Sequence, residues 1–486
     1  MKAAIVIGAG LAGSEAAYAL AEAGWAVTLY EMRPGVRTPA HQTGNFAELV
    51  CSNSFRSDDP ENTVGCLKEE MRALGSLTMA VAAEVAVPAG SGLAVDREAF
   101  ALLVTQRVRA HPQITVRHEE VQNLTQLGVK WDAAAPHAPL IVATGPLTAA
   151  ALAAEIQQQT HAHDLFFYDS MAPLVATESI DQTKTFRASR YGKGAGNEYI
   201  NIPLDRAQYE TFVMALVHAE KVPPRNFEDP KYFEGCLPVE VMAERGIDTL
   251  RHGPMKPMGL RDPQTGKTPY AAVQLRQDNQ AGTIYNIVGF QTRMTWTEQR
   301  RLFRTLPGLE QAEFLRLGAM HRNTYLNAPK LLNDALALRQ AEEEHSPPHP
   351  ARAARASLSP GGRGRSRNGL MGAIHFAGQI VGVEGYVESA AMGLYVGLRV
   401  AGKLQRPPPE TTACGSLIRH VTQGNPSCYE PMNANWGLTP PLPAATPYRS
   451  RKAAYLARAR SDFAAWMKES AVSPDNSIAL LAGICQ

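Results

Sequence analysis

The sequence lacks most of the features that identify secreted, membrane-spanning or strongly charged proteins. Its six cysteines form no CxxC pair and have no zinc-finger spacing, so we expect no metal site or disulfide framework, and a reducing compartment. Apart from the first twenty residues, no run of about 18 uncharged apolar residues suggests a membrane span. A net charge of +2 gives no overall attraction to nucleic acid. These absences predict a cytoplasmic protein without a membrane segment.

The length and composition are those of an ordinary globular protein with more than one domain. The chain has 486 residues, 45% of them hydrophobic and 19% charged. At roughly 150 residues per domain, this length predicts about three units, and two large ones fit equally well.

The N-terminal stretch "MKAAIVIGAGLAGSEAAYAL" is apolar enough to resemble a signal peptide. It carries Glu15 and regularly spaced glycines, however, so we interpret it as a folded strand and helix. Residues 3–7 have the pattern of a buried strand, and residues 14–23 are Ala-rich and helical. A second strand, 26–31, ends in an acidic residue. This order is typical of a dinucleotide-binding unit.

Each part of the GxGxxG motif in this unit has a physical role. Gly8 permits the tight turn, Gly10 lets a pyrophosphate approach the helix N-terminus, and Gly13 lets the helix pack on the strand. Glu31 follows at a distance suited to hydrogen bonds with an adenosine ribose. The residues predicted to bind the cofactor here are Gly8, Ala9, Gly10, Leu11, Ala12, Gly13 and Glu31.

Two later segments favour FAD over NAD. Residues 138–146, "APLIVATGP", predict a strand followed by a turn that closes on the cofactor. Residues 374–402 predict a strand, a glycine loop suited to the flavin end of FAD, and a long Ala/Gly helix, with simple helix–sheet packing as the alternative. The further predicted cofactor residues are Thr144, Gly145, Gly378, Gln379, Gly382, Glu384 and Gly385.

These signals at both ends of the chain predict an α/β protein with a discontinuous, Rossmann-type FAD-binding domain and an inserted α+β domain. We assign 1–180 and 320–486 to the first and 181–319 to the second. Residues 184–330 contain 21 Lys and Arg against 15 Asp and Glu, which leaves room for an anionic partner or for a merely solvated surface. Residues 340–368 are rich in Pro, Ser, Gly and Arg and predict a disordered linker, either a tolerated insertion or an RNA-contacting tail.

Several longer motifs together resemble one family, the folate- and FAD-dependent tRNA (uracil-5-)-methyltransferases. The motifs are "NFAELVCSNSFRSDD", "FEGCLPVEVMAERG", "MHRNTY", "FAGQIVGVEGYVESAA" and "PMNANWGLTPP". The resemblance covers 1 to about 335 and 374–441. The related tRNA wobble-modifying flavoproteins share the N-terminal fingerprint, but they are usually longer, with a helical C-terminal region that is not apparent here.

The resemblance implies methylation of C5 of a uridine in the T loop of tRNA. Methylenetetrahydrofolate would be the one-carbon donor, reduced FAD the carrier and reductant, and NAD(P)H the source of electrons. Two alternatives stay open: the same chemistry on ribosomal RNA, and a flavoprotein that binds RNA or folate without methylating.

Uracil methylation requires a thiolate that adds to C6, and a base that removes the C5 proton. The resemblance implies that Cys236 and Cys51 are the two functional cysteines, with Cys236 as the nucleophile and Cys51 nearer the flavin; the roles could be exchanged. Arg56 could lower the pKa of the Cys51 thiol. The remaining four are expected to be structural: Cys66, Cys414, Cys428 and Cys485.

Four further residues are candidates for binding folate or RNA. His321, Arg322 and Asn323 lie in one short motif and could contact the pterin or the glutamate of the folate, or they could form an interdomain hinge. Trp296 could stack on a base or a pterin, or could be a core residue.

Overall fold

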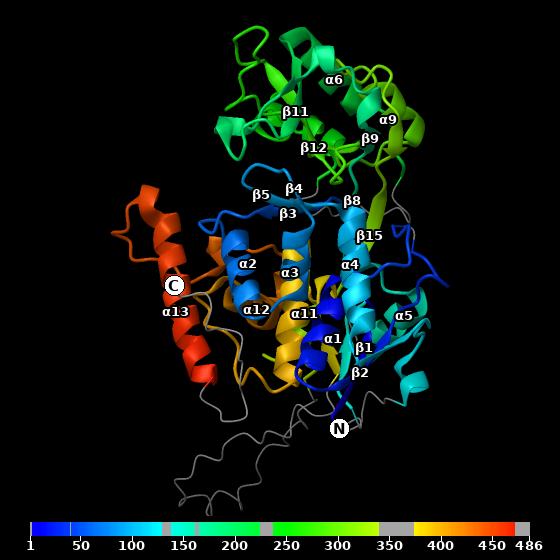
Figure 1. Ribbon diagram of the computed structural model, residues 1–486, viewed down its shortest axis with the longest axis vertical. Helices are drawn as coiled ribbons and strands as arrows, with labels where there is room; N and C mark the ends of the chain where they lie inside the picture. Colours follow the sequence, from blue (N-terminus) through cyan, green and yellow to red (C-terminus); the bar gives the residue numbers. More distant parts are fainter. Residues whose placement is uncertain are drawn as a thin grey trace, which may run out of the picture.

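The computed structural model describes most of the chain. The described residues are 2–38, 40–128, 138–160, 165–223, 237–339 and 374–471, without the side chains of 165–170, 320–322, 324 and 471. Figure 1 shows two lobes, a larger lower lobe and a smaller upper lobe formed by the middle of the chain.

The lower lobe is built on a five-stranded parallel sheet with the order β16-β7-β1-β2-β6. The strands are β1 (Ala3–Ile7), β2 (Ala26–Tyr30), β6 (Ile114–Arg117), β7 (Leu140–Val142) and β16 (Ile374–Phe376). Its strands are largely buried runs of Val, Ile and Leu, as expected for a parallel sheet covered on both faces. Because β16 comes from the C-terminal part of the chain and pairs directly with β7, the nucleotide-binding lobe is discontinuous in sequence.

Helices cover this sheet and extend the lobe. They are α1 (Leu11–Glu22), α2 (Thr63–Ala73), α3 (Leu77–Glu84), α4 (Arg97–Ala110), α5 (Ala150–Thr160), α10 (Ala328–Leu331), α11 (Tyr386–Val400), α12 (Ala413–Gln423) and α13 (Arg451–Ala471). Helices α1 and α11 pack side by side (Figure 1). A Cβ atom at Gly393 would lie 2.1 Å from the carbonyl oxygen of Ala12, so only glycine allows this approach.

The upper lobe is a six-stranded antiparallel sheet with the order β10-β11-β12-β13-β9-β14. The strands are β9 (Leu174–Ala176), β10 (Phe186–Arg187), β11 (Tyr199–Leu204), β12 (Ala271–Gln277), β13 (Ile284–Ile287) and β14 (Phe314–Arg316). The associated helices are α6 (Arg206–His218), α7 (Val239–Glu244), α8 (Thr249–His252) and α9 (Trp296–Phe303). The fold class is therefore the predicted one, a Rossmann-type unit with an inserted α+β unit.

The two faces of the upper sheet differ in chemistry. Along β12, Val273 and Leu275 belong to the apolar core of the lobe, whereas the alternating Gln274 and Arg276 are buried polar residues on the opposite face. Arg276 is paired in register with Tyr199 on one neighbouring strand and Asn286 on the other. The polar face therefore carries a row of hydrogen-bonding side chains.

Two small sheets lie where the lobes meet. Strands β8 (Leu165–Ser170) and β15 (Met320–Tyr325) pair antiparallel and connect the lobes. Strands β3 (Ser54–Ser57), β5 (Gly92–Val95) and β4 (Ala86–Val87) form a three-stranded sheet that lies beneath the upper lobe (Figure 1). The loop between β2 and β3 thus runs from the nucleotide-binding sheet to the junction of the lobes.

Candidate functional site

A pocket crosses the carboxyl ends of the parallel strands, where open α/β sheets bind their ligands; its volume is about 1040 Å³ with the open solvent at its mouth included. It is lined by residues that follow successive strands: Glu31 after β2, Gly8 after β1, Thr144 after β7 and Gly378 after β16. With neighbouring strands about 4.8 Å apart, this row spans roughly 14 Å. We call the end of the pocket beside Glu31 the Glu31 end. Tyr386 lines the opposite end, which we call the Tyr386 end.

The glycine loop after β1 fits a pyrophosphate. Gly8 (φ +94°) and Gly13 are closed in, because added Cβ atoms would lie 2.6 Å from the Ala143 carbonyl oxygen and 1.7 Å from the Gly8 carbonyl oxygen, respectively. A Cβ atom at Gly10 would meet nothing within 4 Å, and Gly10 lines the pocket. No side chain caps the N-terminus of α1. The open space and the uncapped N–H groups suit the pyrophosphate of FAD.

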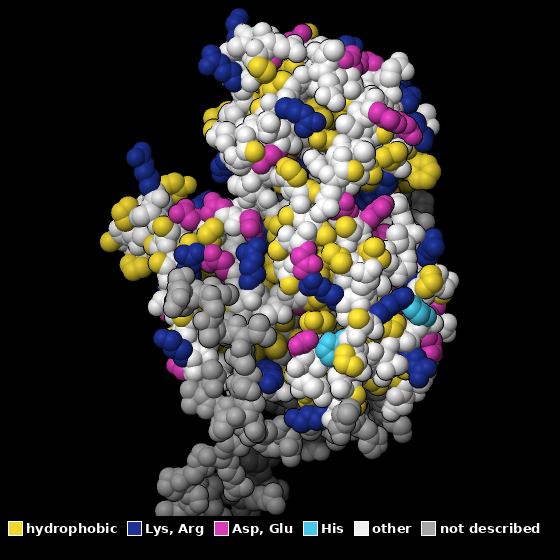
Figure 2. Space-filling model, in the orientation of Figure 1, with side chains coloured by type: hydrophobic (Ala, Val, Ile, Leu, Met, Phe, Trp, Pro, Cys, Tyr) yellow, Lys and Arg dark blue, Asp and Glu magenta, His cyan; other side chains and the backbone are white. Residues whose placement is uncertain are grey.

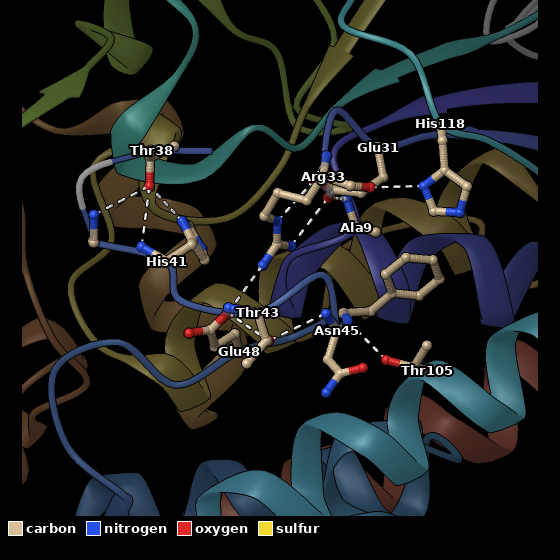
Figure 3. A network of polar contacts seen from close by, with 12 residues as sticks. Ala9, Glu31, Arg33, Thr38, His41, Thr43, Asn45, Glu48, Thr105 and His118 are labelled. Carbon is tan, nitrogen blue, oxygen red and sulfur yellow. Dashed lines mark hydrogen bonds and ion pairs between the residues drawn. The ribbon is translucent and has the colours of Figure 1, made fainter. Parts of the chain in front are cut away.

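The carboxylate of Glu31 organises its end of the pocket (Figure 3). Its Oε2 accepts hydrogen bonds from the Ala9 N–H (2.9 Å) and Arg33 Nη2 (3.1 Å), and its Oε1 accepts from the Arg33 N–H (3.0 Å) and Nε (2.8 Å). Burial alone would raise the pKa of Glu31, but the hydrogen bonds and charge of Arg33 outweigh it and hold the pKa below its usual value. Since each oxygen already accepts two bonds, a ribose hydroxyl would share Glu31 with Arg33.

Arg33 also folds the loop that leads away from this end. Its Nη1 lies 3.5 Å from Glu48 Oε2, and Glu48 in turn accepts hydrogen bonds from the N–H (3.1 Å) and hydroxyl (2.8 Å) of Thr43. His118 Nδ1 lies 2.7 Å from the Arg33 carbonyl oxygen (Figure 3). The described residues of this loop, 33–38 and 40–50, therefore form one wall of the pocket between Glu31 and Cys51.

The two later motifs also reach the pocket. Thr144 and Gly145 (φ +67°) line it after β7, and Gly378 and Gln379 line it after β16. Gln379 Nε2 donates to Glu384 Oε2 at 2.5 Å, so Glu384 orients a lining side chain from behind. The structure thus brings together, at one sheet edge, motifs from three distant parts of the sequence.

Some predicted cofactor residues do not line the pocket. Gly382 (φ +88°) packs against the Tyr429 ring, and Gly385 (φ +113°) is the N-cap of α11. Ala9 reaches the site only through its N–H bond to Glu31, and Gly13 only through its packing on Gly8. These residues shape the loops that line the pocket.

Cys51 lies at the Tyr386 end, half-buried, directly after the lining residue Val50. The Tyr386 hydroxyl accepts hydrogen bonds from the N–H groups of Cys51 (2.7 Å) and Ser52 (3.1 Å). From the upper lobe, Arg316 donates to the carbonyl oxygens of Val50 (3.0 Å) and Cys51 (3.2 Å). Both lobes therefore hold the cysteine at the end of the pocket.

The residues on either side of Cys51 are held in the same way; we call Leu49–Asn53 the Cys51 segment. Arg97 donates to the Leu49 carbonyl oxygen (2.5 Å) and forms an ion pair with Asp278 (2.9 Å). Arg276 Nε donates to Asn53 Oδ1 (3.1 Å). Every residue of the segment is thus bonded to a side chain from another element of the fold.

The surroundings of Cys51 are positively charged. Arg97, Arg276 and Arg316 all interact electrostatically with it, and Asp278 is the carboxylate paired among them. Burial lowers the pKa of Arg316 to about 10 and also lowers the pKa of Arg276. An excess of cations favours the thiolate form of a cysteine.

Comparison with known proteins identifies the family. The family model described as glucose inhibited division protein A matches residues 3–343 and 369–408. A methylenetetrahydrofolate--tRNA-(uracil-5-)-methyltransferase TrmFO from Anaeromyxobacter dehalogenans is 50% identical over 95% of this chain and 96% of its own. One from Desulforudis audaxviator is 51% identical over 96% of this chain and 98% of its own. The chain belongs to the TrmFO family.

A solved structure shows the same fold as this TrmFO-family chain. Aquifex aeolicus GidA in its form II crystal has a TM-score of 0.62 and 14% identity, covering 98% of this chain and 74% of that one. With the pocket geometry, the family assignment makes FAD and methylenetetrahydrofolate the cofactors of this TrmFO-family protein.

The remaining predicted site residues have varied positions in this TrmFO-family chain. Cys236 lies outside the described residues. His321 and Arg322 belong to β15, but their side chains are not described; Asn323, on the same strand, is buried. Trp296 begins α9 in the upper lobe with 63% of its surface exposed, so its interpretation as a core residue is wrong.

Two other expectations need correction or restriction. Cys66 and Cys414 are buried, as expected of structural cysteines, but Cys428 is exposed and is not a packing residue. Arg56, expected to act on the Cys51 thiol, forms an ion pair with Glu388. The predicted linker 340–368 lies outside the described residues, as does Cys485.

Several residues of the site were missed from the sequence: Arg33, Arg97, Arg276, Arg316 and Tyr386. Arg33 follows Glu31 at the spacing of one strand face, and the polar alternation of "AAVQLRQ" in β12 marks Arg276 as unusual, so both had a local signal. The other three had none. Among the described residues, no group of His, Cys, Asp and Glu suits a metal ion, and no helix is long and apolar enough to cross a membrane.

Proposed function

We propose that the protein methylates C5 of a uridine in the T loop of tRNA, with methylenetetrahydrofolate as one-carbon donor and NAD(P)H as the source of electrons. The observation that carries this proposal is the position of Cys51, held by both lobes at the Tyr386 end of a dinucleotide pocket. The family relatives named as tRNA (uracil-5-)-methyltransferases support the same reaction.

The residues of the pocket have separate tasks in this reaction. The N–H groups after Gly10 bind the pyrophosphate of FAD, and Glu31 with Arg33 binds its adenosine ribose. Gly378, Gln379 and Tyr386 border the end where the flavin belongs. Bound FAD supplies one-carbon transfer and redox chemistry, and the protein supplies position, exclusion of water and reactive thiols.

Two cysteines perform the covalent and proton-transfer chemistry. A thiolate adds to C6 of the uracil, so that C5 can attack the one-carbon unit. The C5 proton then leaves to a base, and the C6–S bond breaks as the thiolate departs; reduced flavin would supply the two electrons that turn the transferred methylene into methyl. We assign the nucleophile to Cys236 and the acid/base role beside the flavin to Cys51, with the exchanged roles as the alternative. The arginines around Cys51 support this acid/base role.

The folate and RNA contacts remain proposals. His321, Arg322 and Asn323 lie on the strand that connects the lobes and are proposed folate contacts; Trp296 is a proposed RNA contact. The proposed units are 1–180 with 320–486, and 181–319; β9 (Leu174–Ala176) belongs to the upper sheet, so the upper lobe begins a few residues before the first proposed boundary. A tRNA substrate and NAD(P)H as reductant support a cytoplasmic location for the proposed activity.

Transfer of labelled carbon tests the function. The purified holoprotein, with NADPH and methylene-labelled methylenetetrahydrofolate, is incubated separately with unmodified tRNA and with ribosomal RNA fragments, and each RNA is digested. Labelled 5-methyluridine from tRNA is expected. Label only in ribosomal RNA would move the target, and no label in either, from protein with reducible FAD, would contradict the proposal.

A further inference from the structure

Two loops of the upper lobe form an exposed surface that the proposed chemistry does not use. We call residues 187–196 and 256–267 together the two-loop surface. Tyr191 and Met258, one in each loop, expose 64% and 59% of their surfaces, which is unusual for large apolar side chains. Figure 2 shows Lys and Arg side chains on the upper lobe among such hydrophobic patches.

The ring of Tyr191 is held firmly in its exposed position. Tyr191 has φ +58°, a left-handed conformation that is costly for a bulky residue. Its N–H donates to the Gly259 carbonyl oxygen at 2.8 Å. A Cβ atom at Gly259 would lie 2.9 Å from three ring atoms of Tyr191, so the ring lies over the glycine. One face of the ring is thus supported by backbone, and the side chain remains largely open to solvent.

The same surface carries cations without acidic partners. They are Arg190, Lys193, Lys256, Arg261 and Lys267, none of which forms an ion pair with a described carboxylate. The carboxylates within or beside the loops are already engaged: Asp262 accepts from the Gln264 N–H and the Thr265 hydroxyl, both at 2.9 Å. Glu198 accepts from the Ser189 hydroxyl at 2.6 Å. These two carboxylates keep their charge, but the cations outnumber them, so the surface carries net positive charge.

A continuous row of side chains connects this surface with Cys51. Arg190 interacts electrostatically with Tyr199, whose hydroxyl donates to the Ala89 carbonyl oxygen of the lower lobe at 3.0 Å. Tyr199 is the register partner of Arg276, which bonds to Asn53 in the Cys51 segment. A polymer bound to the two-loop surface therefore lies on the side of the upper sheet that faces the junction of the lobes.

We propose that the two-loop surface binds tRNA, with Tyr191 stacked on an unpaired base and the surrounding cations on phosphates. An exposed aromatic ring among unpaired cations is the usual means of holding unpaired nucleotides, since every base has a face to stack and every linkage a negative charge. This inference rests on the proposed function, because it takes tRNA as the substrate.

The test is the affinity of the holoprotein for unmodified tRNA, measured at several salt concentrations. Tyr191→Ala is expected to weaken binding about tenfold, and Tyr191→Phe to keep it. Lys193→Gln and Lys267→Gln are each expected to weaken binding and to reduce the slope of log affinity against log salt by about 1. Tyr191→Gly, which suits the positive φ, is expected to lose affinity while its thermal midpoint stays at or above that of the wild type.

Two control variants separate this surface from others. Arg300→Gln removes an exposed cation of the same lobe, and Tyr448→Ala removes an aromatic side chain that is 86% exposed on the lower lobe; neither is expected to change affinity. If Tyr448→Ala weakens tRNA binding and Tyr191→Ala does not, the docking surface lies elsewhere and the inference is wrong. The inference also fails if Tyr191→Ala dissociates a dimer with unchanged tRNA affinity, since the surface then joins two copies.

The binding measurements and the methylation assay together distinguish failure of this inference from failure of the proposed function. A wild-type protein that methylates tRNA while all two-loop variants bind normally would overturn only this inference. A wild-type protein that binds no tRNA would overturn both this inference and the proposed function.

Discussion

The two ends of the loop between Glu31 and Cys51 are held in different ways. At Glu31 the partners are local: Arg33 is two residues away and Ala9 is 22. At Cys51 the partners are remote, since Arg316 is 265 residues away and Tyr386 is 335. The first end is built within the nucleotide-binding unit, whereas the second requires both lobes to be assembled.

Because the two ends are held by different residues, we expect FAD binding and methyl transfer to depend on different parts of the molecule. The Glu31 end uses one guanidinium, that of Arg33, between the carboxylates of Glu31 and Glu48, and the backbone of the glycine loop. The Cys51 segment depends on arginines from β12 and β14 of the upper lobe. We therefore expect damage to the first end to weaken FAD binding, and damage to the second to slow methyl transfer in protein that still holds FAD.

The largest expected effect is that of removing the thiol at the junction. Cys51→Ala should slow methyl transfer to tRNA about 10²- to 10⁴-fold, because an acid/base group beside the flavin is lost. The bound FAD per protein, measured by absorbance, should stay unchanged. Cys428→Ala, which removes an exposed thiol, is the matched control and should retain full activity. Normal turnover by the Cys51 variant would remove this residue from the reaction.

Two glycines of one motif should respond in opposite ways. Gly13→Ala should destabilise the fold by about 3 kcal/mol, because its Cβ would overlap the Gly8 carbonyl oxygen, and denaturant unfolding measures this. Gly10→Val should leave unfolding nearly unchanged while weakening FAD binding about 10- to 100-fold, because its methyl groups enter the pocket. Equal loss of stability in both variants would show that Gly10 does not face open space.

Glu70 is a second buried carboxylate, and its pKa shifts in the opposite direction to that of Glu31. Glu70 accepts hydrogen bonds from the N–H groups of Ala413 (2.8 Å) and Cys414 (2.7 Å), yet burial raises its pKa from 4.5 to about 7. The protonated carboxyl therefore stabilises the fold fully below pH 4.5, and this contribution of about 3 kcal/mol is lost as pH rises towards 7. Glu70→Gln should lack this pH dependence of unfolding. An identical pH profile in the variant would contradict the assignment.

The contribution of Glu31 to stability should depend on pH in the opposite direction to that of Glu70. Arg33 holds its pKa below the usual value, so its contribution to stability is present at neutral pH and is lost as pH falls through that lowered pKa.

The predictability of each region follows from the distance between its partners. The strand, glycine turn and acidic residue of the first unit are local patterns. Motif order indicated a domain built from both ends of the chain, and the structure adds that β16 pairs with β7. The predicted helix at 14–23 begins at Leu11 in the structure, because the glycine turn itself contributes the first turn of α1. No local pattern indicated that Arg276 and Arg316 meet a loop more than 200 positions earlier, although the polar alternation of β12 marked Arg276 as unusual. Trp296 was misjudged because large aromatic side chains are usually buried, whereas it begins an exposed helix.

The central claim, that one loop separates cofactor binding from methyl transfer, is tested most directly by measuring two quantities on two variants. The quantities are FAD affinity, from titration of the apoprotein, and the methyl-transfer rate at saturating FAD. Arg316→Met should slow transfer about 10- to 100-fold with FAD affinity within about twofold, since the Cys51 segment loses two supports. Glu31→Gln should weaken FAD binding about tenfold, with a nearly normal rate once FAD is saturating. Parallel loss of both properties in both variants would contradict the account.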